Sequence, residues 1–329
     1  MKELMQTEAV ITVAGLVKRY GEFEAVRGVD FEVGRGEVFG FVGPNGAGKT
    51  TVIECIVGLR KPTEGTVRVL GIDPSANRPQ TTAHVAVQTQ SASLFDTLSV
   101  IETLRLFASF HQNALDPDDV VHQVGLDEER DHRSKNLSGG QARRLLLGVA
   151  LVGDPEIVVL DEPSAGLDPA ARQNLWGLIA SLRIRGVTVL LSTHDMEEAT
   201  SLCDRVAMLV AGRVAALDSP AELIRKRSAT STVSFTVPFN IDIDTLATLA
   251  EPGGLTTSVV GGALRVTIVT SDPDKVLRRV TFEPSVKASE FDIRNGSLQD
   301  MFIELAREEF SEPAQKPASL PSRGKRSRS

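Results

Sequence analysis

The chain has 329 residues, 41% of them hydrophobic and 24% charged, which is enough for two domains with ordinary apolar cores. No uncharged apolar run approaches the roughly 20 residues that cross a bilayer, and the first residues lack the layout of a signal peptide. The sequence therefore predicts a cytoplasmic protein. The net charge of −7 argues against a dedicated nucleic-acid binder. Cys55 and Cys203 lack CxxC spacing and are expected to be reduced core thiols.

The first part of the chain predicts two strands, over 10–17 and 29–33, with a turn over Lys18-Arg19-Tyr20-Gly21. Tyr20 is the only tyrosine of the chain. Its flat ring lies about one strand pair before the next motif, where it could stack on an adenine face.

The next segment fits the phosphate-binding pattern G-x-x-x-x-G-K-[ST], with a predicted buried strand over 37–42 before it and a predicted helix over 51–58 after it. Glycines let such a loop point its N–H groups at an anion. Lys49 is expected to reach the β- and γ-phosphates of a nucleoside triphosphate, and the Thr50 hydroxyl to bind Mg²⁺. The residues expected around the phosphates are Gly43, Pro44, Asn45, Gly46, Ala47, Gly48, Lys49, Thr50 and Thr51.

Short strands are predicted over 66–70 and 83–87, and the second leads into Gln88-Thr89-Gln90. An amide at the carboxyl end of a strand can reach Mg²⁺ or an attacking water. Residues 99–133 then show helical spacing and predict a helical insertion between two halves of the sheet. One apolar face is expected to hold Ile101, Leu104, Leu106, Phe107 and Phe110.

Leu137-Ser138-Gly139-Gly140-Gln141 precedes a predicted apolar helix over 142–152. A serine and two glycines at a helix N-terminus make a second anion site. One fold rarely needs two such sites for one triphosphate. If the second site faces the phosphate loop of a neighbouring copy, a nucleotide can be clamped between two subunits.

Four apolar residues over 157–160 predict a buried parallel strand that ends in Asp161 and Glu162. Ligands of open α/β sheets bind at this end of the strands. Asp161 is expected to hold Mg²⁺ through water, and Glu162 to polarise the attacking water as a general base. A tight turn ending at Asp168 then precedes a predicted helix over 169–185.

A further buried strand is predicted over 187–192, and it ends in Thr193-His194-Asp195. His194 therefore lies at the same edge of the sheet, where it could contact a γ-phosphate and couple it to neighbouring loops. The other four histidines lack such a context and are given no role.

The C-terminal part predicts a helix up to about 227 and then the order β-α-β-β-α-β, which suggests a small ferredoxin-like domain. Its elements are expected over 232–237, 241–250, 255–260, 263–270, 273–280 and 286–293, followed by a final helix over 297–310. Gly261-Gly262 predicts a hairpin turn. The last residues, 311–329, carry a net charge of +4 and are predicted to be a disordered basic tail.

Taken together, these motifs resemble the nucleotide-binding subunit of ABC transporters over about residues 10–221. They stand in family order: the P-loop, the LSGGQ signature, the Walker B strand with Glu162, the D-loop around Asp168, and the switch histidine His194. The resemblance implies an α/β P-loop NTPase core over 8–227, with an antiparallel β subdomain and a helical insertion over about 91–150. The accessory domain over 228–310 resembles one found behind exporters of this family.

The resemblance also implies a mode of action. Two copies close head to tail on two ATP molecules with Mg²⁺, each P-loop meeting the other copy's signature, and Tyr20 matches the aromatic that stacks on adenine. The nucleotide-contacting set then includes Ser138, Gly139, Gly140, Gln141 and Asp168. The Q-loop usually shows one glutamine, whereas Gln88 and Gln90 compete here; the register of Leu94–Leu98 favours Gln90 as catalytic residue and metal ligand.

Within the family, the P-loop looks like that of type-2 exporters, including drug and antibiotic efflux ATPases of the daunorubicin-resistance kind. This implies an ATPase on the inner face of the cell membrane, bound to separate integral-membrane permease subunits, with no nucleic-acid partner. The rival hypothesis is a soluble ABC ATPase with a role outside transport. It predicts tandem ATPase halves, a coiled-coil insertion or a basic face, and none of these is evident in the sequence.

Overall fold

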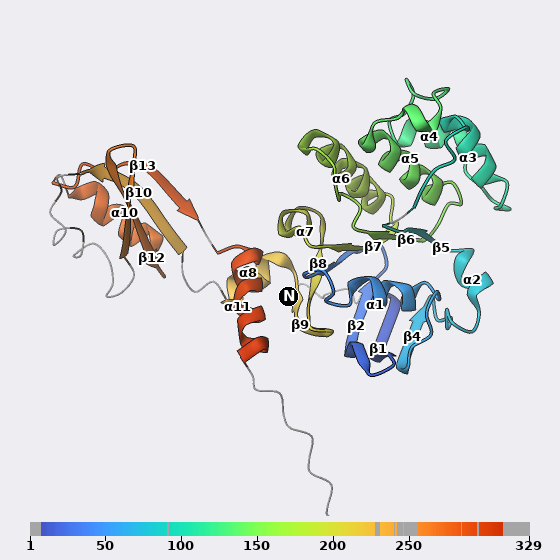
Figure 1. Cartoon of the computed structure of the whole chain (residues 1–329), viewed down its shortest axis with the longest axis horizontal. Coiled ribbons are helices and arrows are strands. Elements are labelled where there is room, and N and C mark those ends of the chain that lie inside the picture. Colours follow the sequence, from blue (N-terminus) through green and yellow to red (C-terminus); the bar gives the residue numbers. More distant parts are fainter. Residues whose placement is uncertain are drawn as a thin grey trace, which may run out of the picture.

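The computed structural model describes residues 8–90, 92–227, 231–239, 241, 246, 255–283, 285–294 and 296–311 (Figure 1). The predicted tail beyond Ser311 lies outside the described residues, and so does the predicted helix over 241–250 except for Ile241 and Leu246. None of the described helices combines the length and apolar content of a membrane span.

The centre of the larger body is a six-stranded sheet in the order β5-β6-β7-β3-β8-β9. The strands pair in parallel except for the β8–β9 hairpin. The predicted strands β3, β5, β6 and β7 are confirmed to within two residues, whereas β8 and β9 were not predicted. The strands are β3 (Val38–Val42), β5 (Val85–Gln88), β6 (Ile157–Asp161), β7 (Thr188–Thr193), β8 (Arg205–Val210) and β9 (Arg213–Asp218).

Both faces of this sheet are covered, because alternate residues of its strands point to opposite sides. In β6, Ile157 and Val159 join one apolar cluster, and Val158 and Leu160 join the other. The first cluster lies toward a three-stranded antiparallel sheet in the order β2-β1-β4 and helix α1 (Figure 1). These elements are β1 (Ala9–Tyr20), β2 (Phe23–Gly34), β4 (Glu64–Val69) and α1 (Lys49–Ile56).

The turn expected over 18–21 is shorter than predicted. Lys18 still pairs with Val26, and Tyr20 with Phe23, so strand β1 continues up to the hairpin at Gly21-Glu22. Tyr20 is therefore presented from a rigid strand end.

The opposite face of the central sheet is covered by helices, including those of the predicted insertion (Figure 1). They are α3 (Val100–Ala108), α4 (Pro117–Gln123), α5 (Gly139–Leu151), α6 (Pro169–Ile184) and α7 (Met196–Leu202), with the short α2 (Arg78–Thr82) and η1 (Ser134–Asn136) nearby in sequence. A reciprocal capping box between Ser99 and Glu102 starts α3. One predicted core residue is wrong: α3 ends at Ala108, so Phe110 leaves the helical face and is 70% exposed.

The accessory domain has the predicted ferredoxin-like topology among its described elements. Its antiparallel sheet runs in the order β11-β12-β10-β13. Gly261 and Gly262 have φ values of 60° and 83°, as a two-residue hairpin with the twist of a type I′ turn requires. The elements are β10 (Ser231–Pro238), β11 (Leu255–Val260), β12 (Ala263–Thr270), α10 (Pro273–Phe282) and β13 (Ser289–Arg294).

The last helix corrects the predicted domain boundary. Helix α11 (Leu298–Ser311) was expected within the accessory domain over 228–310, but it returns to the ATPase body and packs on α7, β8 and α8 (Pro220–Arg227) (Figure 1). Its residues Leu298, Met301 and Leu305 are buried in the same cluster as Leu223. Their spacing makes one apolar stripe, which gains stability only where another apolar surface receives it.

Candidate active site

The loop between β3 and α1 passes so close to neighbouring backbone that two of its glycines cannot carry a side chain. A Cβ on Gly43 would lie 2.4 Å from the carbonyl oxygen of Leu209, and a Cβ on Gly48 would lie 2.6 Å from that of Ala25. Gly46, at φ +82°, has open space around it instead. The loop therefore follows a fixed path to the N-terminus of α1, where backbone N–H groups favour an anion.

A cavity of about 450 Å³ opens beside this loop. It brings together the predicted adenine-stacking residue, most of the P-loop, one Q-loop candidate and the predicted general base. Its lining residues are Tyr20, Phe23, Ala25, Pro44, Asn45, Gly46, Gly48, Lys49, Thr50, Thr51, Gln90 and Glu162. Of the predicted loop residues, Gly43 and Ala47 are not on this wall, and Ala47 is buried in the apolar core.

The Lys49 ammonium group is held from two sides. It donates to the carbonyl oxygens of Gly43 at 2.7 Å and Pro44 at 3.2 Å, and its Nζ lies 3.2 Å from Oε1 of Glu162. Lys49 is only 5% exposed. A buried cation needs such acceptors, and it can exchange them for phosphate oxygens at the same place.

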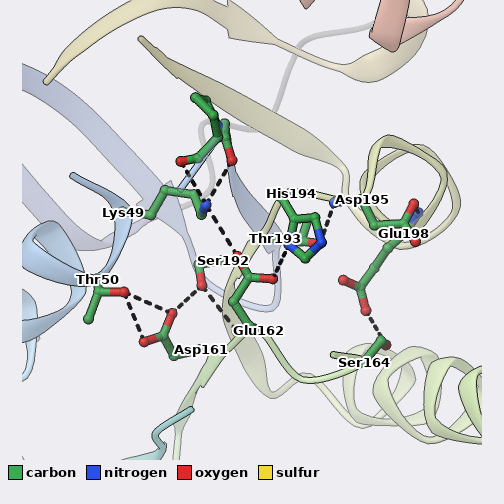
Figure 2. A network of polar contacts seen from close by, with 12 residues as sticks. Lys49, Thr50, Asp161, Glu162, Ser164, Ser192, Thr193, His194, Asp195 and Glu198 are labelled. Carbon is green, nitrogen blue, oxygen red and sulfur yellow. Dashed lines mark hydrogen bonds and ion pairs between the residues drawn. The ribbon is translucent and has the colours of Figure 1, made fainter. Parts of the chain in front are cut away.

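Asp161 lies below the phosphate loop as a hydrogen-bonded carboxylate (Figure 2). The Thr50 hydroxyl donates to its Oδ2 at 3.1 Å, and the Ser192 hydroxyl donates to its Oδ1. Ser192 was not among the site residues predicted from the sequence. Its signal was a small polar residue at the end of a buried strand, directly before Thr193 and His194.

Glu162 is the central residue of the network in Figure 2. Its φ is +51°, a strained conformation for a residue with a side chain. Its N–H group donates to both the carbonyl and the hydroxyl oxygen of Ser192, each at 3.1 Å. The carboxylate then reaches Lys49 with one oxygen and His194 with the other, which lies 2.7 Å from Nδ1. The predicted catalytic pair, Glu162 and His194, is thus in direct contact.

The two Q-loop candidates have different environments. Gln90 lines the cavity, whereas Gln88 is 2% exposed and forms part of β5. Within the described residues, neither amide atom of Gln88 has a hydrogen-bond partner. Val85 and Val87 pack on the α1 side of the sheet, so the alternation of the strand directs Gln88 to the helical face.

The signature segment caps α5. The Ser138 hydroxyl accepts from the N–H of Gln141, and the Gln141 side chain accepts from the N–H of Ser138 at 2.8 Å. Gly140 lies against α6, since a Cβ there would be 2.7 Å from that of Ala171. Ser138, Gly139, Gly140, Gln141 and Asp168 do not line the cavity. A single copy thus carries the two predicted halves of a nucleotide site in different places.

A second cavity, of about 420 Å³, lies next to His194. Residues of α11 line part of it, and no local sequence pattern predicts that this helix lies near the site. Pro44, His194 and Met196 line one part of the cavity, and Phe302 and Ile303 of α11 line another. Helix α11 therefore borders the network that contains His194 and Glu162.

Comparison with known proteins gives a consistent result at the level of sequence. The family model described as "ABC transporter" matches residues 26–165. The Nod factor export ATP-binding protein I of Rhizobium meliloti (strain 1021) is 34% identical over 92% of this chain and 89% of that protein. A fluoroquinolones export ATP-binding protein of Mycobacterium tuberculosis (strain CDC 1551 / Oshkosh) is 41% identical over 67% of this chain and 74% of that protein.

Solved structures agree in fold. The ADP conformation of an ATP-binding cassette of an ABC transporter superposes with a TM-score of 0.60 at 25% identity, covering 66% of this chain and 93% of that one. A dimeric post-hydrolysis state of an ATP-binding cassette bound to ADP and Pi gives a TM-score of 0.56 at 25% identity, covering 64% of this chain and 98% of that one.

Proposed function

Because the chain belongs to the ABC transporter family and is the ATP-hydrolysing subunit of an exporter, we propose that two copies close head to tail over two MgATP molecules and drive efflux through separate membrane permease subunits. The observation that carries this proposal is the continuous contact from Lys49 through Glu162 to His194, at the end of the phosphate loop. It joins the group suited to bind a phosphate to the groups suited to activate water.

Nucleotide binding rests on the cavity beside the P-loop. Its N–H groups and the Lys49 ammonium group would hold the phosphates, and Tyr20 at the rim would stack on the base. The Tyr20 ring is 41% exposed and has the Lys18 ammonium 5.3 Å and the Arg60 guanidinium 5.8 Å from its centre. An exposed flat ring beside two cations suits an electron-rich base attached to a polyanion.

The donor set fits Mg²⁺. Thr50 offers a hydroxyl oxygen, Asp161 a carboxylate and Gln90 an amide oxygen, which are the hard oxygen ligands that Mg²⁺ prefers together with phosphates. No cluster of three His, Cys, Asp or Glu side chains that could hold a metal by itself is found among the described residues. When bound, Mg²⁺ would neutralise phosphate charge and hold the β- and γ-phosphates in place.

The proposed chemistry uses the two oxygens of Glu162 for different tasks. When ATP binds, Lys49 would leave Oε1 of Glu162 and pair with a phosphate oxygen instead. Oε1 of Glu162 would then be free to accept a proton from the attacking water. His194 keeps Oε2 in place through the 2.7 Å contact and can meet the γ-phosphate with its other side. Gln90, which lines the same cavity as Glu162, would help to orient the attacking water.

The second half of each site would come from the partner copy. The solved dimeric cassette is bound to ADP and Pi, and we propose the same assembly here. Ser138, Gly139, Gly140 and Gln141 of one copy would then face the γ-phosphate held by the other, at the N-terminus of α5. Asp168, which caps α6, would meet the partner's site.

The permease and the exported molecule define the physiological role. The relatives export chemically different molecules by name, a Nod factor and fluoroquinolones. We propose a drug- or antibiotic-class substrate for this chain, with the substrate contacts in the membrane subunit and the ATPase at the inner face of the membrane. Capture of a polytopic membrane protein from a detergent extract supports this role, whereas ribosomal proteins or nucleic acid would favour the soluble ABC ATPase.

The mechanism is tested with Glu162→Gln. This variant should bind MgATP and form a stable dimer by light scattering, while phosphate release falls by about 10² or more, the usual contribution of general acid–base catalysis. Lys49→Ala provides the control, because it should bind ATP roughly 10- to 100-fold more weakly and remain monomeric at the ATP concentration that dimerises Glu162→Gln. A Glu162→Gln protein with wild-type turnover contradicts the base assignment, and one that stays monomeric when loaded contradicts the shared site.

A further inference from the structure

Glu198 is a buried carboxylate that the proposed hydrolysis does not use. It is 1% exposed, on α7, four residues after His194. The hydroxyl of Ser164 donates to its Oε1, and the indole N–H of Trp176 donates to both Oε1 of Glu198 and Oγ of Ser164 at 3.1 Å. Figure 2 shows the contact between Ser164 and Glu198 beside the catalytic network.

These three residues join segments that have separate tasks in the proposed function. Ser164 lies two residues after Glu162 and four before Asp168, Trp176 belongs to α6, and Glu198 belongs to the helix that follows His194. One closed set of hydrogen bonds therefore connects the loop between Glu162 and Asp168 with helix α6 and with helix α7, which begins just after His194. Ser164 and Trp176 are 7% and 6% exposed.

An apolar side chain would fill this buried position without the free-energy cost of removing a carboxylate from water. Burial raises the pKa of Glu198, and hydrogen bonds from Ser164, Thr193 and Trp176 lower it again. Burying a carboxyl group costs free energy unless its oxygens accept hydrogen bonds. We therefore interpret Glu198 as a residue that fixes the positions of the side chains that donate to it.

The backbone of the proposed base, Glu162, has to be held in its unusual conformation by neighbouring residues. On the strand side, Ser192 holds it. On the loop side, Ala165 donates to the Glu162 carbonyl at 3.3 Å and Leu167 to that of Ser164 at 3.2 Å. Both local bonds involve the loop itself, whereas the Ser164–Glu198 contact ties it to another element.

We propose that Glu198 is a positioning residue that locks the loop from Ser164 to Asp168 onto α7, so that Glu162 and His194 keep their contact and Asp168 is presented to the partner copy. The inference rests on the proposed function. Arg172 of α6 pairs with Asp195 at 2.9 Å and closes a second link between α6 and the start of α7. The loop, α6 and α7 thus act as one rigid unit around the proposed base.

The test compares Glu198→Leu, which removes the acceptors, with Glu198→Gln, which keeps an acceptor oxygen. Steady-state hydrolysis by the full chain should show kcat lowered about tenfold or more in Glu198→Leu with KM within about threefold, because only the arrangement of the transition state is lost. Glu198→Gln should restore kcat to within about threefold of wild type. Glu197→Leu, the same change at the exposed neighbouring position, is the matched control and should keep wild-type kcat.

Trp176 supplies a readout besides activity, since it is the only tryptophan of the chain. In a Glu162→Gln background, MgATP should shift its fluorescence emission, and Glu198→Leu should abolish that shift while ATP binding persists. If Glu198→Leu does not fold, Ser164→Ala replaces it, with an expected severalfold loss of kcat.

Wild-type kcat in folded Glu198→Leu or Ser164→Ala overturns the inference, and so does a Glu198→Gln variant as impaired as Glu198→Leu. Absence of ATP hydrolysis by the wild-type chain would instead contradict the proposed function.

Discussion

Nδ1 of His194 lies 2.7 Å from Oε2 of Glu162, although the two residues are 32 positions apart and directly follow different strands of the central sheet. The contact exists because β6 and β7 are parallel neighbours whose carboxyl ends meet at one edge. The same edge receives Lys49 from the phosphate loop, which makes Glu162 the meeting point of three chain segments.

Replacing His194 by alanine should lower turnover at least about tenfold without a comparable loss of ATP affinity, since a hydrogen bond to a charged group contributes roughly 1.5–3 kcal/mol. Glu162 would lose the partner that orients it and keep Lys49. His122→Ala, which removes an exposed histidine paired with Asp127, should leave hydrolysis unchanged. Phosphate release measured beside equilibrium ATP binding distinguishes the two effects, and equal losses in both would contradict a catalytic role for His194.

Lys49→Ala should weaken ATP binding roughly 10- to 100-fold, the equivalent of the lost charge-assisted hydrogen bonds. The buried Glu162 carboxylate also loses its cation, so some loss of stability should accompany the change. Calorimetric titration with ATP measures the affinity. Lys275→Ala, an exposed lysine on α10, is the control; unchanged affinity in Lys49→Ala would remove this residue from the phosphate site.

Gln88 and Gln90 should respond in opposite ways to substitution. Gln88→Leu replaces a buried amide without described partners by an apolar group of similar size, and should raise the free energy of unfolding by about 1–3 kcal/mol with little effect on hydrolysis. Gln90→Ala should reduce hydrolysis with little effect on stability, because Gln90 is exposed at the cavity. Denaturant unfolding measures the stability of both variants, and phosphate release measures their hydrolysis. Loss of hydrolysis in Gln88→Leu with normal hydrolysis in Gln90→Ala would make Gln88 the functional glutamine.

Met301→Ala should destabilise the ATPase body rather than the accessory domain. Met301 is 3% exposed within the core cluster shared with α8, and truncation of such a residue costs about 2–5 kcal/mol. Ile303→Ala, on the same helix but 42% exposed, should change the unfolding free energy by much less. Hydrogen exchange of α7 and β8 locates the effect, and protection lost only in α10 and β10 would contradict the docking of α11.

The pH dependence of stability should change in Glu198→Gln. Burial raises the pKa of Glu198, with Asp195 adding to the increase, so ionising this carboxyl group costs more in the folded than in the unfolded protein. Below the ordinary carboxyl pKa, Glu198 is protonated in both the folded and the unfolded wild type, and its ionisation has no effect on stability. As the pH rises through the raised pKa of Glu198, the wild type progressively loses stability. The Gln variant lacks this loss. Its unfolding free energy relative to wild type should therefore increase between acidic and neutral pH, and a flat difference would refute the shift.

Features encoded by contiguous residues were predictable from the sequence alone. The P-loop with its flanking strand and helix, the signature segment before its helix and the two carboxylates at the end of β6 each depend on local spacing and on the periods of helices and strands. The ferredoxin-like order of the accessory domain followed from the same alternation and from the Gly261-Gly262 turn.

Only the tertiary structure decided which distant segments meet. Ser192 on Asp161, Glu198 on Ser164 and α11 on α8 join residues from different elements, and no local pattern specifies such partners. Gln88 and Gln90 differ by their positions in the folded sheet, although they have the same chemistry. Burial and hydrogen bonding depend on what surrounds a side chain in space, and that surrounding exists only after the sheet, its helices and the returning C-terminal helix have packed together.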